Sequence, residues 1–310
     1  MSKQTGWRAH PLAPQWWPTW LGFGILRALV FVLPMQWLCT FGAGLGRLAG
    51  RLLPSRLAIV RVNLRLCFPE LSEQERETLA RSHFASVGRG AMEAAEAWWG
   101  RDTELARHTR LEGLANVEAA RAKGKGVILL LAHFTTLEMC GWILSRHIPD
   151  LDVVYKPTHN TVVERLMSKI RRANLGGLIA SSDFRGIVRA LRAQRILWYV
   201  PDQDFGRRRT VFAPFMGVPA ATLNMTSRLA ERTGAVVLPV QSLRLPNGDW
   251  VVRIEQALSD FPSGDDVADA TAVNAVIERH VRAAPEQYFW VHRRFKTRPD
   301  PAEPSPYQAL

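Results

Sequence analysis

The second half of the chain alternates between short apolar runs and amphipathic patterns of helical period. Four runs rich in Val, Ile and Leu predict strands: GVILLLA (126–132), LDVVYK (151–156), RILWYV (195–200) and AVVLPV (235–240). Between these runs, apolar residues recur at helical spacing over Asn160–Asn174, Asp183–Gln194 and Ala220–Arg232. The alternation predicts an α/β fold, in which helices pack on the faces of a sheet.

Local signals predict three further elements. Asn247 and Gly248 in SLRLPNGDWVVRI are typical of the turn in a β-hairpin. Apolar residues at helical spacing predict a last helix over Asp265–Ala283. Ser72 followed by Glu75 is a capping box, which predicts the start of a long amphipathic helix.

Residues 19–41 are almost wholly apolar and carry one charge, Arg27. A signal peptide is disfavoured because no small-residue cleavage pattern follows the segment. The segment is long enough to span a bilayer, but Arg27 and Pro34 also suit a bent helix lying in the interface. A soluble core helix is the third interpretation. A cluster of tryptophans argues against it, because tryptophan is enriched at membrane–water interfaces: Trp7, Trp16, Trp17, Trp20 and Trp37. We therefore expect an N-terminal apolar helical membrane anchor.

Five arginines follow this segment: Arg47, Arg51, Arg56, Arg61 and Arg65. By the positive-inside bias, they predict that the body of the protein lies on the cytoplasmic side. We accordingly expect a membrane-associated helical segment (1–65), an α/β domain (66–299) and a loose C-terminal tail (300–310), which is rich in proline.

Three glycines recur at every fourth position, at Gly42, Gly46 and Gly50. On a helix they would form one smooth stripe that allows a second helix to pack closely. Flexible turn glycines are the alternative.

The formal net charge is +12, from 40 Lys and Arg against 28 Asp and Glu. This charge indicates an anionic partner, which could be a phospholipid surface, a nucleic acid or an acidic protein. The cysteines, Cys39, Cys67 and Cys140, form no C-x-x-C pair. Neither a disulfide framework nor a zinc site is expected, and a reducing compartment fits the sequence.

Candidate chemistry follows the first predicted strand, in AHFTTLE, where His133 precedes Glu138 by five residues. The two side chains could pair if His133 lies in the loop and Glu138 in the first helical turn, with Thr135 or Thr136 as N-cap. A neutral imidazole can then take a proton from a hydroxyl while the carboxylate orients the ring. Alternatively, Glu138 could serve only a capping box with Thr135, and His133 could be a core histidine.

Other nucleophilic schemes have little support, because the chain contains no G-x-S-x-G, H-E-x-x-H or P-loop motif. Without a nucleophile of the enzyme, His133 would activate a hydroxyl of the substrate. The electrophile would then have to be preactivated, for example as a thioester.

AHFTTLE fits the H-x-x-x-x-D/E motif of the glycerolipid and lysophospholipid acyltransferase superfamily. Further segments, in order, are NLRLCFPELSEQER, YKP, WYVPDQDFG, VFAPFMGVPAAT, VLPV and APEQYFWVHRRFKTRP. Together they resemble the late acyltransferases of lipid A biosynthesis, the lauroyl and myristoyl transferases. The resemblance covers about residues 16–299.

The resemblance implies a glycerolipid acyltransferase-like mixed sheet flanked by helices. It implies transfer of a fatty acyl chain, lauroyl or similar, from acyl carrier protein to a hydroxyl of a 3-hydroxyacyl chain on a Kdo-bearing lipid A precursor. His133 would be the base and Glu138 its partner. The expected partners are acyl carrier protein, the glycolipid and the membrane, with the catalytic domain on the cytoplasmic side of the bacterial inner membrane. No cofactor is implied beyond the acyl-phosphopantetheine of the donor.

A bisphosphorylated acceptor requires cations beside the site. Lys156 and Arg171 are candidates, although Lys156 stands where the family usually has arginine, and lysine lacks the bidentate fork. In PDQDFGRRR, Asp202 and Asp204 could orient arginines or the acceptor, and Arg207 could meet phosphate, Kdo carboxylates or the carrier protein. A metal site at the two aspartates is disfavoured because loop aspartates are usually turn formers.

Two rival functions remain open. A lysophospholipid or glycerol-phosphate acyltransferase would use the same chemistry, but the F-P-E-G-T-R block of those enzymes is replaced by VPDQDFG. A basic nucleic-acid-binding protein would explain the charge but not the Trp-rich apolar N-terminus, and no RNP, KH or helix-turn-helix signature is visible. We therefore expect no nucleic-acid partner.

Overall fold

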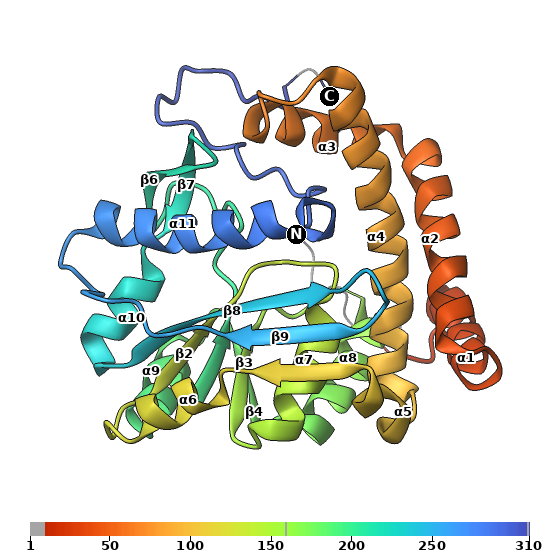
Figure 1. Ribbon diagram of the computed structural model, residues 1–310, viewed down its shortest axis with the longest axis horizontal. Helices are drawn as coiled ribbons and strands as arrows, with labels where there is room; N and C mark the ends of the chain where they lie inside the picture. The colour runs from red at the N-terminus through yellow and green to blue at the C-terminus, as the bar shows by residue number, and fades with distance from the viewer. Residues whose placement is uncertain (1–9, 159, 309) are drawn as a thin grey trace.

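A mixed, seven-stranded sheet forms the centre of the computed structural model, which describes residues 10–158, 160–308 and 310 (Figure 1). The strand order is β1-β9-β8-β2-β5-β3-β4. The strands are β1 (Thr109–Glu112), β2 (Val127–Leu130), β3 (Leu151–Tyr155), β4 (Gly177–Ala180), β5 (Ile196–Tyr199), β8 (Val236–Arg244) and β9 (Trp250–Ile254). The predicted α/β fold with a mixed sheet flanked by helices is confirmed.

The centre of this sheet is parallel, because β2 pairs in parallel with both β5 and β8, and β3 pairs in parallel with β4 and β5. The predicted hairpin is also present, since β9 runs antiparallel to β8. The turn residue Gly248 has a φ of 94°, which favours glycine. The carboxyl ends of β2, β3 and β5 therefore meet at one edge, where open α/β sheets place their ligands.

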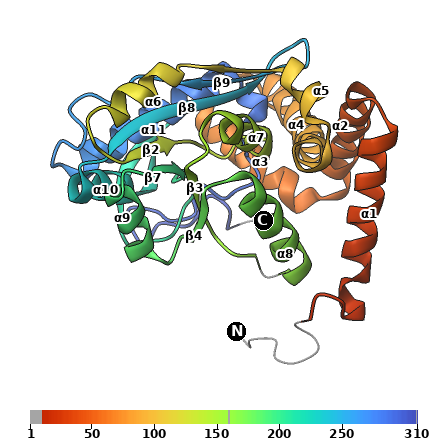
Figure 2. The same cartoon turned by 90° about the horizontal axis from the view of Figure 1, so that it is seen from below.

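Helices cover both faces of the sheet. One core cluster joins α6 (Leu114–Arg121) and α7 (Leu137–His147) to one face. A second cluster joins α9 (Phe184–Arg192), α10 (Met225–Thr233) and α11 (Asp266–Ala283) to the other face. Figure 2 shows β3 and β4 between α8 (Thr161–Asn174) on one side and α9 with α10 on the other.

The N-terminal helices stand against one end of this assembly. They are α1 (Trp17–Val32), α2 (Met35–Leu52), α3 (Pro54–Cys67), α4 (Glu73–Trp99) and the short α5 (Asp102–Arg107). Ser72 and Glu75 form the predicted capping box at the start of α4, with both of its hydrogen bonds made. Helices α2 and α4 run side by side (Figure 1).

Close packing of α2 on α4 depends on the predicted glycine stripe. A Cβ atom at Gly46 would lie 2.0 Å from the carbonyl oxygen of Phe84, and one at Gly42 would lie 2.6 Å from that of Gly88. A Cβ at Gly50 would lie 2.9 Å from the ring of Phe84. The glycines therefore serve a helix–helix contact, and they are not turn glycines.

The prediction of a membrane anchor over residues 19–41 is wrong. Within the described residues, no helix is both long and apolar enough to cross a bilayer. The physical cause is Pro34, because a residue before proline avoids the helical region and Leu33 is accordingly extended. The break leaves α1 with 16 residues, about 24 Å of helix, which is shorter than a hydrocarbon core of about 30 Å.

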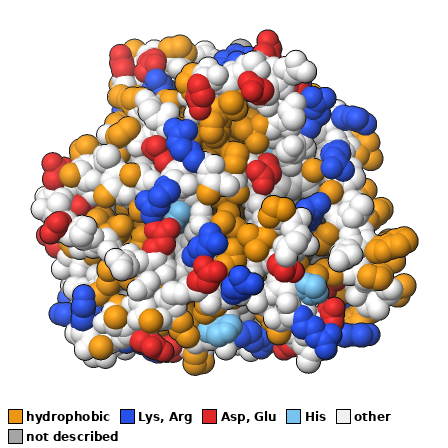
Figure 3. All heavy atoms as spheres, in the orientation of Figure 1, with side chains coloured by type: hydrophobic (Ala, Val, Ile, Leu, Met, Phe, Trp, Pro, Cys, Tyr) orange, Lys and Arg blue, Asp and Glu red, His pale blue; other side chains and the backbone are white. Residues whose placement is uncertain are grey.

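Apolar side chains nevertheless remain exposed on α1 and α2. Trp17, Leu21 and Val32 on α1 are 63%, 66% and 76% exposed, and Trp37 on α2 is 71% exposed. Figure 3 shows hydrophobic side chains gathered at the right-hand edge, where these helices lie in Figure 1. Part of the predicted tryptophan cluster is therefore exposed to solvent, and Trp7 lies outside the described residues.

The predicted helix over Ala220–Arg232 begins too early. Residues up to Leu223 belong to a separate hairpin of β6 (Thr210–Phe215) and β7 (Val218–Leu223), and α10 starts only at Met225. Met216 and Gly217 form the turn of this hairpin, and both have a positive φ. The sequence VPAATL has no clear strand or helix period, so tertiary pairing with β6 decides its structure.

Candidate active site

A cavity of about 600 Å³ opens over the carboxyl ends of β3 and β5, beside α7 and α8. His133 and Glu138 both line it, together with apolar side chains from several elements: Leu137, Trp142, Val153, Ile170, Phe184 and Trp198. The cavity lies where the parallel strands end, as expected for an open α/β sheet.

His133 reaches this cavity from the loop between β2 and α7. The loop backbone is held by the C-terminal segment: the N–H of Phe289 donates to the carbonyl of His133 at 2.9 Å, and the N–H of Thr135 donates to that of Gln287 at 2.8 Å. The position of the imidazole is therefore fixed by a segment more than 150 residues away in the sequence.

The carboxylate of Asp202 holds His133 at two points. His133 Nδ1 lies 2.5 Å from Asp202 Oδ1, and the backbone N–H of His133 donates to Asp202 Oδ2 at 2.9 Å. Asp202 is 3% exposed, whereas the side chain of His133 is 30% exposed. Since Nδ1 donates to the carboxylate, Nε2 is the ring nitrogen that can accept a proton.

The electrostatics of this pair favour a charged imidazole. Burial alone would lower the pKa of His133, but the charge of Asp202 and its hydrogen bond outweigh burial and raise it above the usual value. Burial alone would raise the pKa of Asp202, but the charge of His133 and the hydrogen bonds from it hold the pKa below its usual range. The carboxylate therefore stabilises the imidazolium that forms when His133 takes a proton.

The expected pairing of Glu138 with His133 is wrong. Glu138 Oε1 lies 2.5 Å from Arg171 Nη2, and Glu138 Oε2 accepts a hydrogen bond from the indole of Trp98 at 2.9 Å. Glu138 does lie in the first turn of α7, as predicted. Glu138 does not form the alternative capping box with Thr135, because α7 begins after Thr136. The hydroxyl of Thr136 does not cap the helix and donates to the carbonyl of Ser242.

The structure brings together only some of the predicted binding residues. Lys156 and Arg171 line the cavity. Asp204 is buried and accepts hydrogen bonds from the backbone and the hydroxyl of Thr297. Arg207 donates to the carbonyls of Arg298 and Pro299. Asp204 and Arg207 therefore contact the C-terminal segment, and their contact with substrate stays a prediction.

Three features of the site were not predicted from the sequence. Asp202, expected as a binding residue, is the partner of His133. Trp98 contacts Glu138, and Arg208 and Arg209 line the cavity whereas Arg207 does not. The sequence places Asp202 just after the predicted strand over residues 195–200, but only the structure shows that this strand, β5, pairs with β2, which precedes His133.

A buried polar network supports the His133 loop from α4. Arg244 on β8 forms an ion pair with Glu93, with an Nη2–Oε2 distance of 2.5 Å, and donates to the hydroxyl of Ser86 at 3.1 Å. Ser86 in turn bonds the hydroxyl of Thr135 at 2.8 Å. Because Glu93 is fully buried and Arg244 is 8% exposed, this pair is screened from water and fixes α4 against β8.

These groups could perform base-assisted acyl transfer. The imidazole of His133, oriented by Asp202, can accept a proton from a hydroxyl placed in the cavity. The apolar walls suit a hydrocarbon chain, and Lys156, Arg208 and Arg209 supply positive charge at the same cavity.

Comparison with known proteins agrees with this chemistry. Residues 5–297 match the family described as "Bacterial lipid A biosynthesis acyltransferase". The chain is 39% identical to the lipid A biosynthesis lauroyltransferase of Escherichia coli K12, over 93% of this chain and 94% of that protein. It is 36% identical to the palmitoleoyltransferase of the same organism, with the same coverage. It is 28% identical to the myristoyltransferase, over 95% of this chain and 91% of that protein.

The family match covers nearly the whole chain, and relatives more than 30% identical cover over nine tenths of it. The predicted membership is confirmed, and with it the prediction of an acyltransferase acting in lipid A biosynthesis. The chain belongs to the bacterial lipid A biosynthesis acyltransferase family.

Proposed function

We propose that this acyltransferase moves a fatty acyl chain from the thioester of acyl carrier protein to a hydroxyl of a 3-hydroxyacyl chain on a Kdo-bearing lipid A precursor. One observation carries the proposal: the His133–Asp202 pair opens into a cavity lined mainly by apolar side chains. A hydrocarbon chain can lie in such a cavity with its reactive carbonyl beside the imidazole.

In the proposed reaction, His133 Nε2 takes the proton of the acceptor hydroxyl while its oxygen attacks the thioester carbonyl. The tetrahedral intermediate collapses, the bond to sulfur breaks, and the leaving thiolate receives the proton from the imidazolium. Asp202 stabilises the imidazolium throughout the reaction. Because it binds Nδ1, it leaves Nε2, on the other side of the ring, able to exchange the proton. General-base assistance of this kind contributes about 10²- to 10⁴-fold in rate.

Glu138 has a different role in this proposal from the one that its spacing suggested. Both of its oxygens are engaged, by Arg171 and Trp98, at the cavity wall. The pair holds the Arg171 guanidinium in place, where it can attract a phosphate or the developing oxyanion. Glu138 is therefore a positioning residue for Arg171.

Cations beside the cavity support an acidic substrate. Lys156 at the end of β3, together with Arg208 and Arg209 after β5, lines the cavity. Phosphates and Kdo carboxylates of the acceptor would bind there, and the acidic carrier protein would approach the same side.

A lipid surface is the proposed source of the acceptor, on the cytoplasmic side of the bacterial inner membrane. The exposed apolar side chains of α1 and α2 support contact of this face with lipid. We expect the protein to sediment with vesicles containing anionic lipid. Replacing Trp17 and Leu21 with Ser should reduce the bound fraction, whereas unchanged sedimentation would exclude this contact.

The function is tested with the purified full chain, lauroyl carrier protein and two acceptors, a Kdo-bearing lipid A precursor and a lysophospholipid. We expect mass spectrometry to find one added acyl group on the lipid A precursor. Acylation of the lysophospholipid alone would refute the proposed acceptor, and transfer only from a free fatty acid or coenzyme A thioester would refute the proposed donor.

A further inference from the structure

The cavity reaches both faces of the sheet. Trp198 and Tyr199 are consecutive on β5, so their side chains point to opposite faces, and they belong to different core clusters. Both line the cavity, and so do Val153 and Val154 on β3. The cavity therefore wraps over the ends of these strands and has two apolar arms.

One arm lies on the face covered by α9 and α10 and is lined by Ile187 and Met225. Arg209 borders this arm, since its carbonyl accepts the backbone N–H of Asn224, the residue before Met225, at 3.3 Å. Arg209 therefore places a positive charge at the border of this arm.

The other arm lies along α7. Leu137, Gly141 and Ser145 line it at helical spacing, so they share one face of α7. From Glu138 to Ser145, this face extends about 10 Å away from His133. Trp142 and Trp198 border the arm and are only 7% and 6% exposed, so it leads into the protein.

Gly141 keeps this second arm open. It lies in the interior of α7, where glycine costs about 1 kcal/mol of helix stability relative to alanine. A Cβ atom at this position would lie 3.0 and 3.1 Å from two atoms of the Trp198 ring. Any side chain at this position would therefore press on Trp198 and narrow the arm.

We propose that the arm along α7 holds the transferred acyl chain, and that Gly141 and Trp198 together set its length. The proposal rests on the proposed function and adds the determinant of donor specificity to it. A larger residue at position 141 shortens the space, whereas a smaller ring at position 198 extends it.

The test measures kcat/KM for a series of saturated acyl carrier protein thioesters of increasing chain length. Gly141→Ala should move the optimum to shorter chains, with about a tenfold loss, relative to wild type, for each methylene that the arm no longer holds. Trp198→Phe should move the optimum to longer chains. Thermal unfolding of each variant establishes that it is folded.

Two controls make the test specific. Gly44→Ala is the same substitution in the interior of α2, where a Cβ meets nothing within 4 Å, and it should leave activity and the chain-length optimum unchanged. Met225→Trp narrows the other arm and should leave the optimum unchanged, even if the rate falls.

The outcomes separate the two levels of the proposal. Active Gly141→Ala and Trp198→Phe variants with the wild-type optimum would overturn this inference and leave the proposed function standing. A shift caused by Met225→Trp would likewise overturn it, because the acyl chain would then lie in the opposite arm. A wild-type chain that transfers no acyl group from any thioester would overturn both.

Discussion

Asp202 binds both the backbone and the ring of His133, through one carboxylate oxygen each. This arrangement fixes the position of the residue and the tautomer of its ring at the same time. It also joins the ends of two neighbouring strands, because His133 follows β2 and Asp202 follows β5. The dyad of the candidate active site is therefore built from sheet topology, and the five-residue spacing between His133 and Glu138 does not create it.

We predict that Asp202→Asn lowers kcat by about 10²- to 10⁴-fold while the protein stays folded. The asparagine keeps the size of the side chain but loses the charge that stabilises the imidazolium. Asp204→Asn is the matched control in the same loop, because Asp204 bonds Thr297 and does not contact His133. Equal losses in the two variants would contradict the role of Asp202.

The pH profile should report the same pair. A base must be neutral to act, so the activity of the wild type falls as pH drops through the pKa of His133, which Asp202 raises above the usual value. Removing the charge of Asp202 lowers that pKa, so in Asp202→Asn the acidic limb of kcat/KM should move to lower pH. An acidic limb that stays in place or moves upward would show that another group controls it.

The pair of Glu138 and Arg171 should behave as a unit. Glu138→Gln leaves Arg171 without its carboxylate, and Arg171→Gln leaves Glu138 without its cation, so each single change should reduce kcat/KM. Because both changes remove the same interaction, the fold-loss of kcat/KM in the double variant should be smaller than the product of the two single fold-losses. Losses that multiply fully would show that the two residues act independently. In Glu138→Gln, Arg171→Gln and the double variant, the acidic limb of kcat/KM should stay at its wild-type pH, unlike in Asp202→Asn.

Packing of α2 against α4 gives a prediction about stability. Gly46→Ala should lower the free energy of unfolding by about 1–3 kcal/mol, because its Cβ would overlap the carbonyl of Phe84. Gly44→Ala, two residues away on the same helix, meets nothing and should gain up to about 1 kcal/mol. Urea denaturation measures both, and effects of the same sign would contradict this account of the glycine stripe.

The buried ion pair of Glu93 and Arg244 gives a second prediction about stability. Glu93→Gln should destabilise the fold by about 3–5 kcal/mol, because it leaves the Arg244 charge buried without its partner. The double variant Glu93→Leu/Arg244→Met should recover much of that loss, since no charge then remains buried. Urea denaturation of both variants is the measurement, and a double variant less stable than Glu93→Gln would contradict this reasoning.

Local patterns predicted much of the fold. Each of the four apolar runs contains a strand, the Asn247-Gly248 turn forms, and Ser72 caps α4 as expected. Patterns failed where tertiary contacts decide. VPAATL becomes a strand only because β6 pairs with it. Likewise, Pro34 divides an apolar segment whose length alone suggested a bilayer span.

The candidate site was predictable only in part, for the same reason. Sequence placed His133 at the end of a strand and Glu138 in the first helical turn, and both line the cavity. It could not reveal that Asp202, 69 residues away, reaches the imidazole, because that contact depends on the strand order. The same holds for Trp98, which comes to Glu138 through the packing of α4 on α7.

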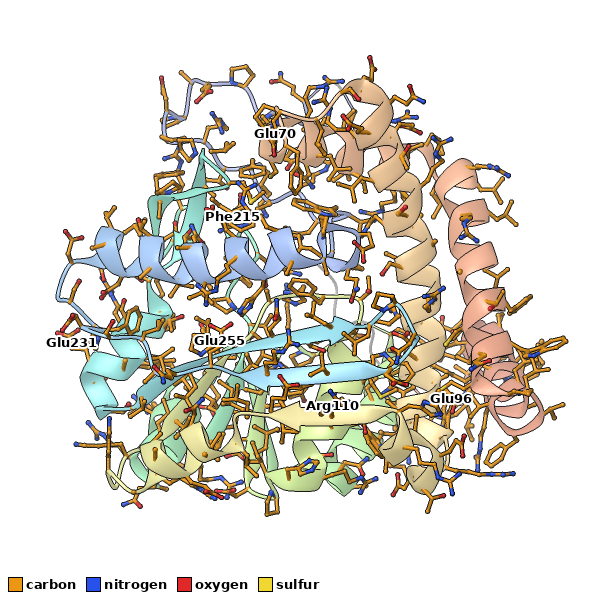
Figure 4. The ribbon with its side chains drawn as sticks, viewed as in Figure 1. Glu70, Glu96, Arg110, Phe215, Glu231 and Glu255 are labelled. Carbon is orange, nitrogen blue, oxygen red and sulfur yellow. The ribbon has the colours of Figure 1, made fainter. Side chains whose placement is uncertain are left out.

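Two other buried titratable side chains, His280 and Glu96, lie outside the site. His280 Nε2 lies 2.7 Å from Glu255 Oε1, between α11 and the end of β9, and Figure 4 shows Glu255 between that helix and the sheet. Burial raises the pKa of Glu96, near the end of α4, to about 7, and the nearby charge of Glu104 adds to this. Neither group lines the active-site cavity.

The most direct test of the account replaces the proposed base. Purified wild type and His133→Ala are compared for transfer of lauroyl from acyl carrier protein to a Kdo-bearing lipid A precursor, with acylated product measured by mass spectrometry. We expect a single added lauroyl group with wild type, and a rate at least about 10²-fold lower with a His133→Ala protein that unfolds at the wild-type temperature. A folded His133→Ala protein that transfers lauroyl at nearly the wild-type rate would contradict it.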